Sequence, residues 1–206
     1  MKKVVLIGAG GYCSGVIDSL KKMNQYEIAG ITDPVKKGTL CGAQILGTDD
    51  ELERLYCEGI QYAHVTVGSI GDPSLRRKLV KKAKTIGFEL ISIIDPTSII
   101  SEFTTLGEMI YVAKNAVINS DVSIGNYCMI NTGCIVEHGC ILEDFVHIAP
   151  GAVVAGDVHI GENSHVGLNA SILQGIHINP NVIIGAGSVV LGDVLSEKTV
   201  YGVVKG

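Results

Sequence analysis

The sequence lacks three features that would place the chain in other classes of protein. It has no apolar run near the length of about eighteen residues that crosses a membrane. Its six cysteines include no CxxC pair, which argues against a disulfide framework and a structural zinc site and favours reduced thiols. Positive charge is scarce after residue 95, with 3 Lys and Arg against 10 Asp and Glu, so this half is poorly suited to binding nucleic acids or anionic membranes.

The first residues resemble a signal peptide only briefly. Met1 begins a short apolar stretch that glycines and Asp18 soon interrupt, and we interpret this stretch as a first β-strand. We therefore expect a cytoplasmic protein.

The second half of the chain has a hydrophobic pattern with a period of six residues. From Ile100 to Val190 every sixth residue is Ile, Leu or Val, at all sixteen positions and without an insertion. If that residue is counted as the first of each hexad, the fifth is small or β-branched throughout. This period predicts a parallel β-helix, in which three short strands form one triangular coil of about eighteen residues and both positions point inward. Corners such as Gly125-Asn126 and Gly161-Glu162-Asn163 suggest tight bends with positive φ.

The first 95 residues alternate strand-like and helix-like stretches. The pattern predicts strands over 3–7, 27–32, 62–67 and 89–94, helices over about 14–23 and 73–86, and turn-rich segments at 33–47 and 69–73. This order is typical of a small, parallel, Rossmann-like α/β domain. Asp95-Pro96 marks a junction, so we expect an α/β domain over 1–95 and the β-helix over 96–206.

A glycine-rich loop follows the first predicted strand and opens the first helix. Gly8-Ala9-Gly10-Gly11 would present backbone N–H groups and a helix N-terminus to a diphosphate, and Asp33 is placed to accept hydrogen bonds from ribose hydroxyls. The third glycine of a dinucleotide fingerprint would fall at Cys13, and the domain is too short for two mononucleotide halves. A single nucleotide therefore fits better than NAD. Close packing of helix on strand is the alternative reason for such a turn.

Five of the six histidines lie in the repeat region, and one differs from the others in its position. His138 occupies a third hexad position beside Glu137, where a neutral imidazole would suit a general base; an ordinary surface pair is the alternative. The other four, His147, His159, His165 and His177, occupy sixth positions and form two pairs eighteen residues apart. They are interpreted as surface residues, or alternatively as ligands of a zinc-dependent hydratase.

Three cysteines are spaced one hexad apart. Cys128, Cys134 and Cys140 would lie on three successive faces of one coil. We interpret them as small apolar residues of the interior. A three-thiolate metal site is the alternative.

An ordered set of segments, spread over the whole chain, carries a resemblance to a known family. These segments are Gly8–Gly11, Leu46–Leu52, Asp95–Ser98, Ile130–Gly133, Glu137-His138, Phe145–Gly151 and Gly185–Val190. With them the chain resembles the bacterial hexapeptide-repeat sugar acyltransferases, the group of sialic-acid O-acetyltransferases and UDP-4-amino-sugar N-acetyltransferases.

The resemblance implies a left-handed β-helix that forms a homotrimer, with acetyl-CoA as co-substrate in the groove between adjacent solenoids and with no metal. It implies that the N-terminal domain holds a sugar or sugar nucleotide as the acetyl acceptor. His138 then corresponds to the catalytic base, with Glu137 beside it. The residues implied in binding are His147, Gly156, Leu168 and Ala186 for acetyl-CoA, and Gly10, Gly11, Tyr12, Asp33 and Asn131 for the acceptor.

At three places the sequence departs from these relatives. One is the glycine-rich loop, which has Tyr12-Cys13-Ser14 where they favour a histidine and small residues. Gly139 stands where they commonly place an acid after the catalytic histidine, and Pro34 replaces a second acid after Asp33. We expect direct transfer of an acetyl group to an amine or hydroxyl of the sugar in a ternary complex. A sensor or scaffold that binds nucleotide sugars without turnover is the first alternative, and the zinc-dependent hydratase is the second.

Overall fold

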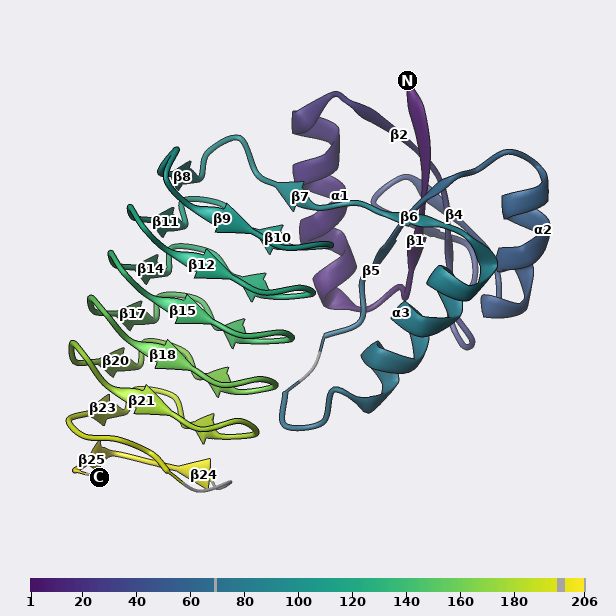
Figure 1. The fold of residues 1–206 in the computed structure, drawn as a ribbon. Coiled ribbons are helices and arrows are strands. Elements are labelled where there is room, and N and C mark those ends of the chain that lie inside the picture. Colours follow the sequence, from purple (N-terminus) through teal and green to yellow (C-terminus); the bar gives the residue numbers. More distant parts are fainter. Residues whose placement is uncertain (69, 196–198, 206) are drawn as a thin grey trace. The chain divides into compact units, whose positions relative to one another are not determined.

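The computed structural model describes residues 1–68, 70–195 and 199–205, and the chain divides into two compact units, Met1–Pro96 and Thr97–Gly206 (Figure 1). Each unit has its own core, and each is described by itself. Ser69, which begins the second predicted turn, lies outside the described residues.

The N-terminal unit is built on one six-stranded sheet. Its strands are β1 (Lys2–Ile7), β2 (Tyr26–Thr32), β3 (Thr39–Leu40), β4 (Ala43–Gly47), β5 (Tyr62–Val65) and β6 (Glu89–Leu90), in the order β3-β4-β2-β1-β5-β6. Neighbouring strands are parallel except β3 and β4, which form an antiparallel hairpin. The helices are α1 (Gly11–Met23), α2 (Leu52–Cys57) and α3 (Ser74–Ile86), with a 3-10 turn at Asp49–Glu51 and a short strand β7 (Ile93–Ile94) near the end of the unit. The predicted Rossmann-like α/β domain is confirmed.

Some N-terminal elements differ from the prediction. The segment 33–47 is not only a turn but contains the β3–β4 hairpin. Strand β4 packs closely on its neighbour β2, because a Cβ added at Gly30 would lie 2.3 Å from the side chain of Leu46. The unpredicted helix α2 is anchored by Leu52 and Leu55, which are buried. The predicted strand over 89–94 is divided into β6 and β7, and α1 begins at Gly11 rather than near residue 14.

The second unit is a parallel β-helix with one two-residue strand in every hexad. The first face holds β10 (Tyr111–Val112), β13 (Met129–Ile130), β16 (His147–Ile148), β19 (His165–Val166), β22 (Ile183–Ile184) and β24 (Thr199–Val200). The second face holds β8 (Ile99–Ile100), β11 (Val117–Ile118), β14 (Ile135–Val136), β17 (Val153–Val154), β20 (Ser171–Ile172), β23 (Val189–Val190) and β25 (Val203–Val204). The third face holds β9 (Thr105–Leu106), β12 (Ser123–Ile124), β15 (Ile141–Leu142), β18 (His159–Ile160) and β21 (His177–Ile178).

The hexad pattern predicts the interior of this solenoid. Each paired strand lies eighteen residues from its neighbour through most of the unit, as in Val117 with Ile135 and Ile141 with His159. From Ile110 to Val194 every side chain at a first or fifth position is buried. Neighbouring coils therefore cover one another's apolar faces, which is the source of stability in repeat proteins.

The bends of the solenoid depend on the fourth hexad position. Fourteen consecutive fourth positions, from Met109 to Gly187, have φ between +52° and +70°, the left-handed region that favours Gly, Asn and Asp. Asn163 has this conformation, but Gly125 and Gly161 do not, so the expectation of positive φ is wrong for those two glycines. They are small for another reason: a Cβ at Gly161 would lie 2.4 Å from the backbone nitrogen of Pro180 in the next coil.

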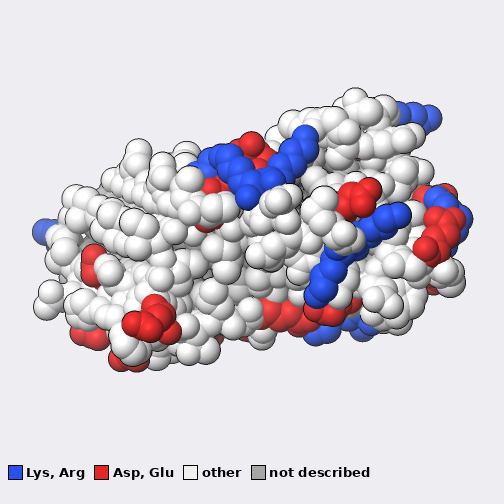
Figure 2. Space-filling view, turned by 90° about the horizontal axis from the view of Figure 1, so that it is seen from above, with Lys and Arg blue, Asp and Glu red and all other residues white. Residues whose placement is uncertain are grey.

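The helices and the surface of the structure agree with the hydropathy and charge of the sequence. None of the helices within the described ranges is long and apolar enough to cross a membrane. In the view of Figure 2 the solenoid surface, at the left, is mostly uncharged with isolated acidic patches. The scarcity of positive charge that the sequence predicts for this unit is thus visible on its surface.

Candidate functional site

The glycine-rich loop leaves the start of α1 open. Gly10 precedes the helix without a side-chain cap, and a Cβ added at Gly10 or Gly11 would meet nothing within 4 Å. The first N–H groups of a helix have no partner within the helix, and the helix dipole favours an anion there. Tyr12, half-buried, lies in the same first turn. The loop therefore has both room and donors for a phosphate group.

Asp33 holds this loop in place. One carboxylate oxygen accepts from the backbone N–H of Ala9 at 2.8 Å, and the other accepts from those of Val35 and Lys36 at 3.0 and 2.8 Å. Partial burial acts to raise the pKa of the Asp33 carboxyl, but these N–H donors and the charge of Lys36 outweigh it, so the pKa lies below its usual range. The ionised carboxylate thus bridges the ends of β1 and β2.

A cation that the sequence reasoning missed lies at the same loop. The ammonium group of Lys36 donates to the backbone carbonyl of Ala9 at 2.7 Å. Its only sequence signal was its place three residues after Asp33. A lysine beside an open helix N-terminus adds positive charge where a phosphate would bind.

The strand order places a topological switch point between β1 and β5. The chain leaves β1 toward β2 on one side and returns with β5 on the other, and ligands of open α/β sheets bind beyond the carboxyl ends of the strands at such a switch point. Gly8, at the end of β1, lies against Val67, at the end of β5, since a Cβ on Gly8 would be 2.6 Å from the Val67 side chain. Gly10 and Gly11 follow directly on this edge.

Two buried polar side chains lie behind this edge. The guanidinium of Arg76 donates weakly to the Val67 carbonyl at 3.4 Å, and its Nε and Nη2 have no partner among the residues that the structure describes. His64 is completely buried, with Nδ1 at 2.8 Å from the Ile91 carbonyl. Burial lowers the pKa of His64 to about 3, against the hydrogen bond to Ile91, and the charge of Arg76 lowers it further.

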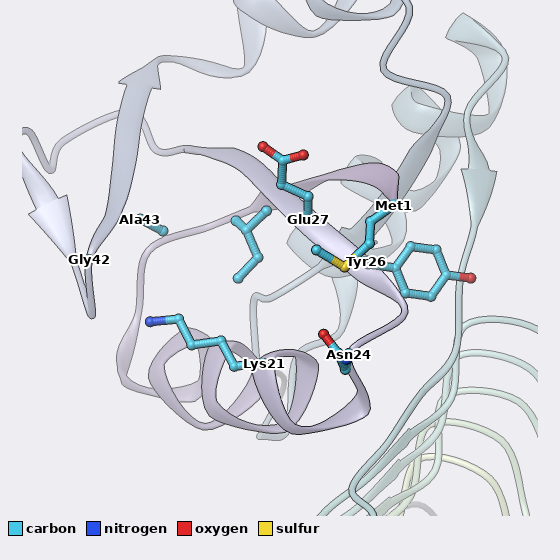
Figure 3. Close-up of a pocket in the computed structure, with 8 residues that line it drawn as sticks. Met1, Lys21, Asn24, Tyr26, Glu27, Gly42 and Ala43 are labelled. Carbon is cyan, nitrogen blue, oxygen red and sulfur yellow. The ribbon is translucent and has the colours of Figure 1, made fainter.

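A cavity of the N-terminal unit lies away from the carboxyl ends of β1 and β5. It has a volume of about 290 Å³ and is lined by Met1, Lys21, Asn24 and the beginning of β2, with Gly42 and Ala43 of the hairpin. Figure 3 shows Lys21 extending from α1 toward the hairpin, where its ammonium donates to the Cys41 carbonyl at 2.8 Å. Because Met1 and Tyr26 stand at the amino ends of their strands, this cavity does not belong to the glycine-rich loop.

The first candidate cluster of the solenoid lies at the corner after the second face. His138 is exposed, and its ring lies over Gly156 of the next coil: a Cβ on Gly156 would be 2.5 to 3.1 Å from three ring atoms. Glu137 is half-buried and precedes the histidine on the same corner. Gly156 therefore provides the space that the imidazole occupies.

The second candidate cluster lies on the first face and its corner. Asn131 donates through Nδ2 to Nε2 of His147 at 2.7 Å and to the Ile148 carbonyl at 3.2 Å. Because Nε2 accepts, the proton of neutral His147 is on Nδ1. The ring of His147 contacts that of His165 edge-on, with 4.5 Å between centroids. Burial lowers the pKa of His165, which favours the neutral ring in this stack.

The predicted solenoid residues thus fall into two groups within one chain. His138, Glu137 and Gly156 share the corner after the second face, whereas Asn131 and His147 belong to the first face. Leu168 and Ala186, both exposed, lie at the corner after the first face, beyond β19 and β22. The structure brings Asn131 to His147 and His138 to Gly156, and it does not bring the two groups to one corner.

No set of three or more His, Cys, Asp or Glu residues within the described ranges is arranged to hold a metal ion. The three hexad cysteines are buried, and the Sγ atoms of Cys128 and Cys140 donate to the carbonyls of Glu143 and Ala155. Burial raises the pKa of Cys134 to about 12, which opposes the thiolate that a metal requires. His159 contacts Glu143 at 2.8 Å and the ring of His177 edge-on.

Comparisons with known proteins agree with the fold of both units. Residues 3–83 match the family model of the PglD N-terminal domain, and residues 121–156 match the model of the bacterial transferase hexapeptide with six repeats. The repeat match identifies the solenoid as a hexapeptide-repeat, left-handed parallel β-helix. No curated protein matches the sequence significantly.

Several solved structures match almost the entire chain. GDP-perosamine N-acetyltransferase from Caulobacter crescentus, a histidine-to-alanine variant in complex with CoA and GDP-perosamine, is 35% identical, with 97% of this chain and 93% of that chain covered and a TM-score of 0.91. The acetyltransferase domain of PglB from Neisseria gonorrhoeae, in complex with acetyl coenzyme A, is 32% identical, with coverages of 98% and 96% and a TM-score of 0.91. WeeI from Acinetobacter baumannii, 24% identical with coverages of 97% and 96% and a TM-score of 0.83, shares the fold.

These likenesses extend over both units and exceed 30% identity for two of the proteins. The chain belongs to the bacterial hexapeptide-repeat sugar acetyltransferases.

Proposed function

We propose that the protein transfers the acetyl group of acetyl-CoA to an amine of a nucleotide-linked sugar. The observation that carries this proposal is the exposed imidazole of His138, which lies over Gly156 in a family whose relatives hold CoA and GDP-perosamine. The relative named above as GDP-perosamine N-acetyltransferase favours an amine over a hydroxyl as the acceptor.

The proposed reaction is a direct acyl transfer. The sugar amine attacks the thioester carbonyl, and His138 takes a proton from the amine as the C–N bond forms. The C–S bond then breaks, and the imidazolium returns its proton to the departing thiolate, which gives CoA and the N-acetylated sugar. A backbone N–H near Gly156 would hold the tetrahedral oxyanion, and one such donor is typically worth about 3 kcal/mol. Glu137 stands beside the base.

The N-terminal unit would bind the nucleotide part of the acceptor. Gly10, Gly11 and Tyr12 surround the open start of α1, and Asp33 has an ionised carboxylate at the end of β2. The first N–H groups of a helix suit a diphosphate, and the acceptor capacity that remains on Asp33 suits ribose hydroxyls. No residue here distinguishes one base from another, so a panel of nucleotides is required.

Acetyl-CoA would bind where two copies of the chain meet. His147, Leu168 and Ala186 are on a different corner from His138 and Gly156, so a neighbouring solenoid must bring the second group to the first. Asn131, which fixes the His147 ring, would lie near the acceptor in such a site. Proximity then supplies part of the rate enhancement, because a bimolecular step becomes a bound one.

A homotrimer would supply this arrangement, and one face of the solenoid is suited to it. The second face carries outward apolar side chains, with Ile99 66% exposed, Val153 36% and Val189 38%. Leu173 and Leu191, which follow two of its strands, are 50% and 43% exposed. Exposed apolar side chains gathered on one face are typical of an interaction surface, and three copies around one axis would cover them on every chain.

The solution mass tests the assembly. We expect light scattering to give three times the chain mass of 21.7 kDa. Val189→Asp, on the outward side of the apolar second face and 38% exposed, should give monomers with little activity, because the split site cannot form. Ile141→Asp, on the third face and 49% exposed, is the matched control and should remain a trimer. A wild-type monomer with full activity would contradict the assembly.

Two observations support a reducing compartment. Acetyl-CoA is the proposed donor, and none of the six cysteines, all within the described residues, forms a disulfide. We propose that the protein works in the cytoplasm with small-molecule substrates.

Release of free thiol from acetyl-CoA tests the reaction. The purified protein is incubated with GDP-, UDP- and CMP-linked amino sugars, sialic acid and free amino sugars. One nucleotide-linked amino sugar should support release. His138→Ala should lower turnover by roughly two to four orders of magnitude, with acetyl-CoA binding nearly intact. Turnover close to wild type in this variant would exclude His138 as the base, and binding of acetyl-CoA without release for any acceptor would favour a non-catalytic scaffold.

A further inference from the structure

We infer that Asp157 is the positioning carboxylate of His138, supplied by the next coil of the solenoid. The inference rests on the proposed function, because it gives His138 a partner for its role as base. Asp157 does not touch either substrate in this proposal. It acts through the imidazole.

The two side chains cross the gap between the same two coils in opposite directions. The ring of His138 reaches forward over the Cα of Gly156. A Cβ added at Gly156 would lie 2.5 Å from the ring. Asp157 reaches back over the Cα of Gly139, where a Cβ would lie 2.2 Å from its Oδ1. Since 138 and 139 are adjacent, as are 156 and 157, these two approaches place the ring and the carboxylate at one corner, which follows β14 and β17.

This crossing needs a glycine on each coil. Gly156 admits the imidazole and Gly139 admits the carboxylate, and all three atoms nearest to a Cβ at Gly139 belong to Asp157. The pair is also held by the backbone, because the N–H of Asp157 donates to the carbonyl of His138 at 2.9 Å. Asp157 occupies a left-handed turn, with φ of +60°, and its carboxylate is exposed at the corner that it shares with the histidine.

Two other carboxylates of this region are less suitable than Asp157 for positioning His138. Asp121 occupies the same turn position one coil before Gly139. Side chains at this position reach back toward the preceding coil, as Asp157 does over Gly139 and Asn169 over Gly151, so Asp121 is directed away from His138. Glu137 is adjacent in sequence, but the crossing geometry does not involve it.

The chemical role is stabilisation of the imidazolium. When His138 takes the amine proton it becomes a cation, and the carboxylate of Asp157 at the same corner would lower the free energy of that charge and fix the orientation of the ring. The proton passes only between the amine, His138 and the thiolate. In this proposal the two side chains interact directly after a small rotation of the ring, or through one water molecule.

The test replaces the carboxylate of Asp157 by an amide of the same size and shape. Asp157→Asn should lower kcat by about tenfold or more, with KM for both substrates nearly unchanged, because only the protonated histidine is affected. Asp157→Glu should retain part of the activity. Asp121→Asn is the matched control and should keep the wild-type kcat. Asp157→Asn at the wild-type kcat, or a loss that appears with Glu137→Gln instead, would overturn the inference.

A transposition separates the role from mere structure. In the double variant Gly139→Asp with Asp157→Gly, the carboxylate moves to the other coil, and the space at 139 is freed because only Asp157 filled it. The φ of +68° at 139 is one that Asp tolerates. The double variant should recover activity that Asp157→Gly alone loses. If His138→Ala is itself fully active, the proposed function has failed; if only the Asp157 variants are unaffected, the inference alone has failed.

Discussion

The two units of the chain obtain their structure from different kinds of information. The solenoid repeats one arrangement, with a left-handed residue at fourteen consecutive fourth hexad positions and an apolar residue at every first position. The N-terminal unit uses each of its turns once: Gly8 closes on Val67, Asp33 closes on Ala9, and Asn24 ends α1 in the left-handed region. Local repetition fixes the solenoid, and single long-range contacts fix the N-terminal unit.

The comparison extends to the way polar groups are used. Side chains of the solenoid meet residues about one coil away, such as Asn131 with His147 and Cys128 with Glu143. In the N-terminal unit the partners are far apart in sequence, as for Ser19, whose hydroxyl donates to Asp95 at 2.6 Å across seventy-six residues. A substitution in the solenoid should therefore act through the neighbouring coils, while one in the N-terminal unit should act on the whole sheet.

The largest loss of stability is expected from a substitution in the solenoid core. Ile160→Ala removes a completely buried first-position side chain, and the free energy of unfolding should fall by about 2–5 kcal/mol. Ile141→Ala, on the same face in the preceding coil and 49% exposed, should cost less than about 1 kcal/mol. Urea denaturation of both variants at one protein concentration measures the difference. Equal losses would contradict the assignment of inward and outward positions.

The N-terminal unit should respond to pH through a residue that has no counterpart in the hexad pattern. His64 has a pKa of about 3 in the folded unit because it is buried, against about 6.5 in the unfolded chain. Below pH 6.5 the unfolded chain binds a proton that the folded unit does not, so stability is complete above that pH and is lost progressively as the pH falls toward 3.

Denaturation at several pH values measures this linkage. Between about pH 7.5 and pH 5.5 the loss attributable to His64 should be about 1 kcal/mol. His64→Asn keeps a donor for the Ile91 carbonyl but cannot titrate, so its stability should depend less on pH than that of the wild type. Parallel curves for the two proteins would show that the buried histidine does not titrate as described.

Most of the solenoid could be predicted because its signal is periodic. The residues Ile100 to Val190 specified the strand positions and the inward faces, and the same register placed His147 above His165. The turn conformation was predicted only in part. Asn163 has positive φ, but the glycines at 125 and 161 are small because the next coil approaches them closely, which a single sequence does not reveal.

The N-terminal unit and the site were harder to predict. The β3–β4 hairpin depends on the contact of Leu46 with Gly30, which joins distant residues. Lys36, Arg76 and Asp157 were missed because each becomes relevant only through a partner far away in sequence. Arg76 shows this best: an arginine within the charged run of a helix is normally exposed, yet here it is buried behind the glycine-rich loop.

The smallest expected change in stability comes from glycine-to-alanine substitutions that alter only the backbone preference. It has opposite signs in the two units. A Cβ added at Gly175 or at Gly11 would meet nothing within 4 Å, so neither substitution creates a clash. Gly175 has φ of +69° at a solenoid corner, whereas Gly11 is the first residue of α1. Gly175→Ala should therefore destabilise by about 1 kcal/mol, because alanine is strained in the left-handed region.

Gly11→Ala should stabilise the N-terminal unit by up to about 0.5–1 kcal/mol, because alanine loses less conformational entropy than glycine when a helix forms. Gly175→Asn is the control for the solenoid and should be nearly neutral, since asparagine tolerates positive φ. Thermal unfolding of the three variants gives the signs directly. A destabilised Gly11→Ala would mean that the start of α1 needs glycine for its fold, whereas a stable variant that binds the nucleotide sugar poorly would mean that it needs glycine for the approach of the ligand.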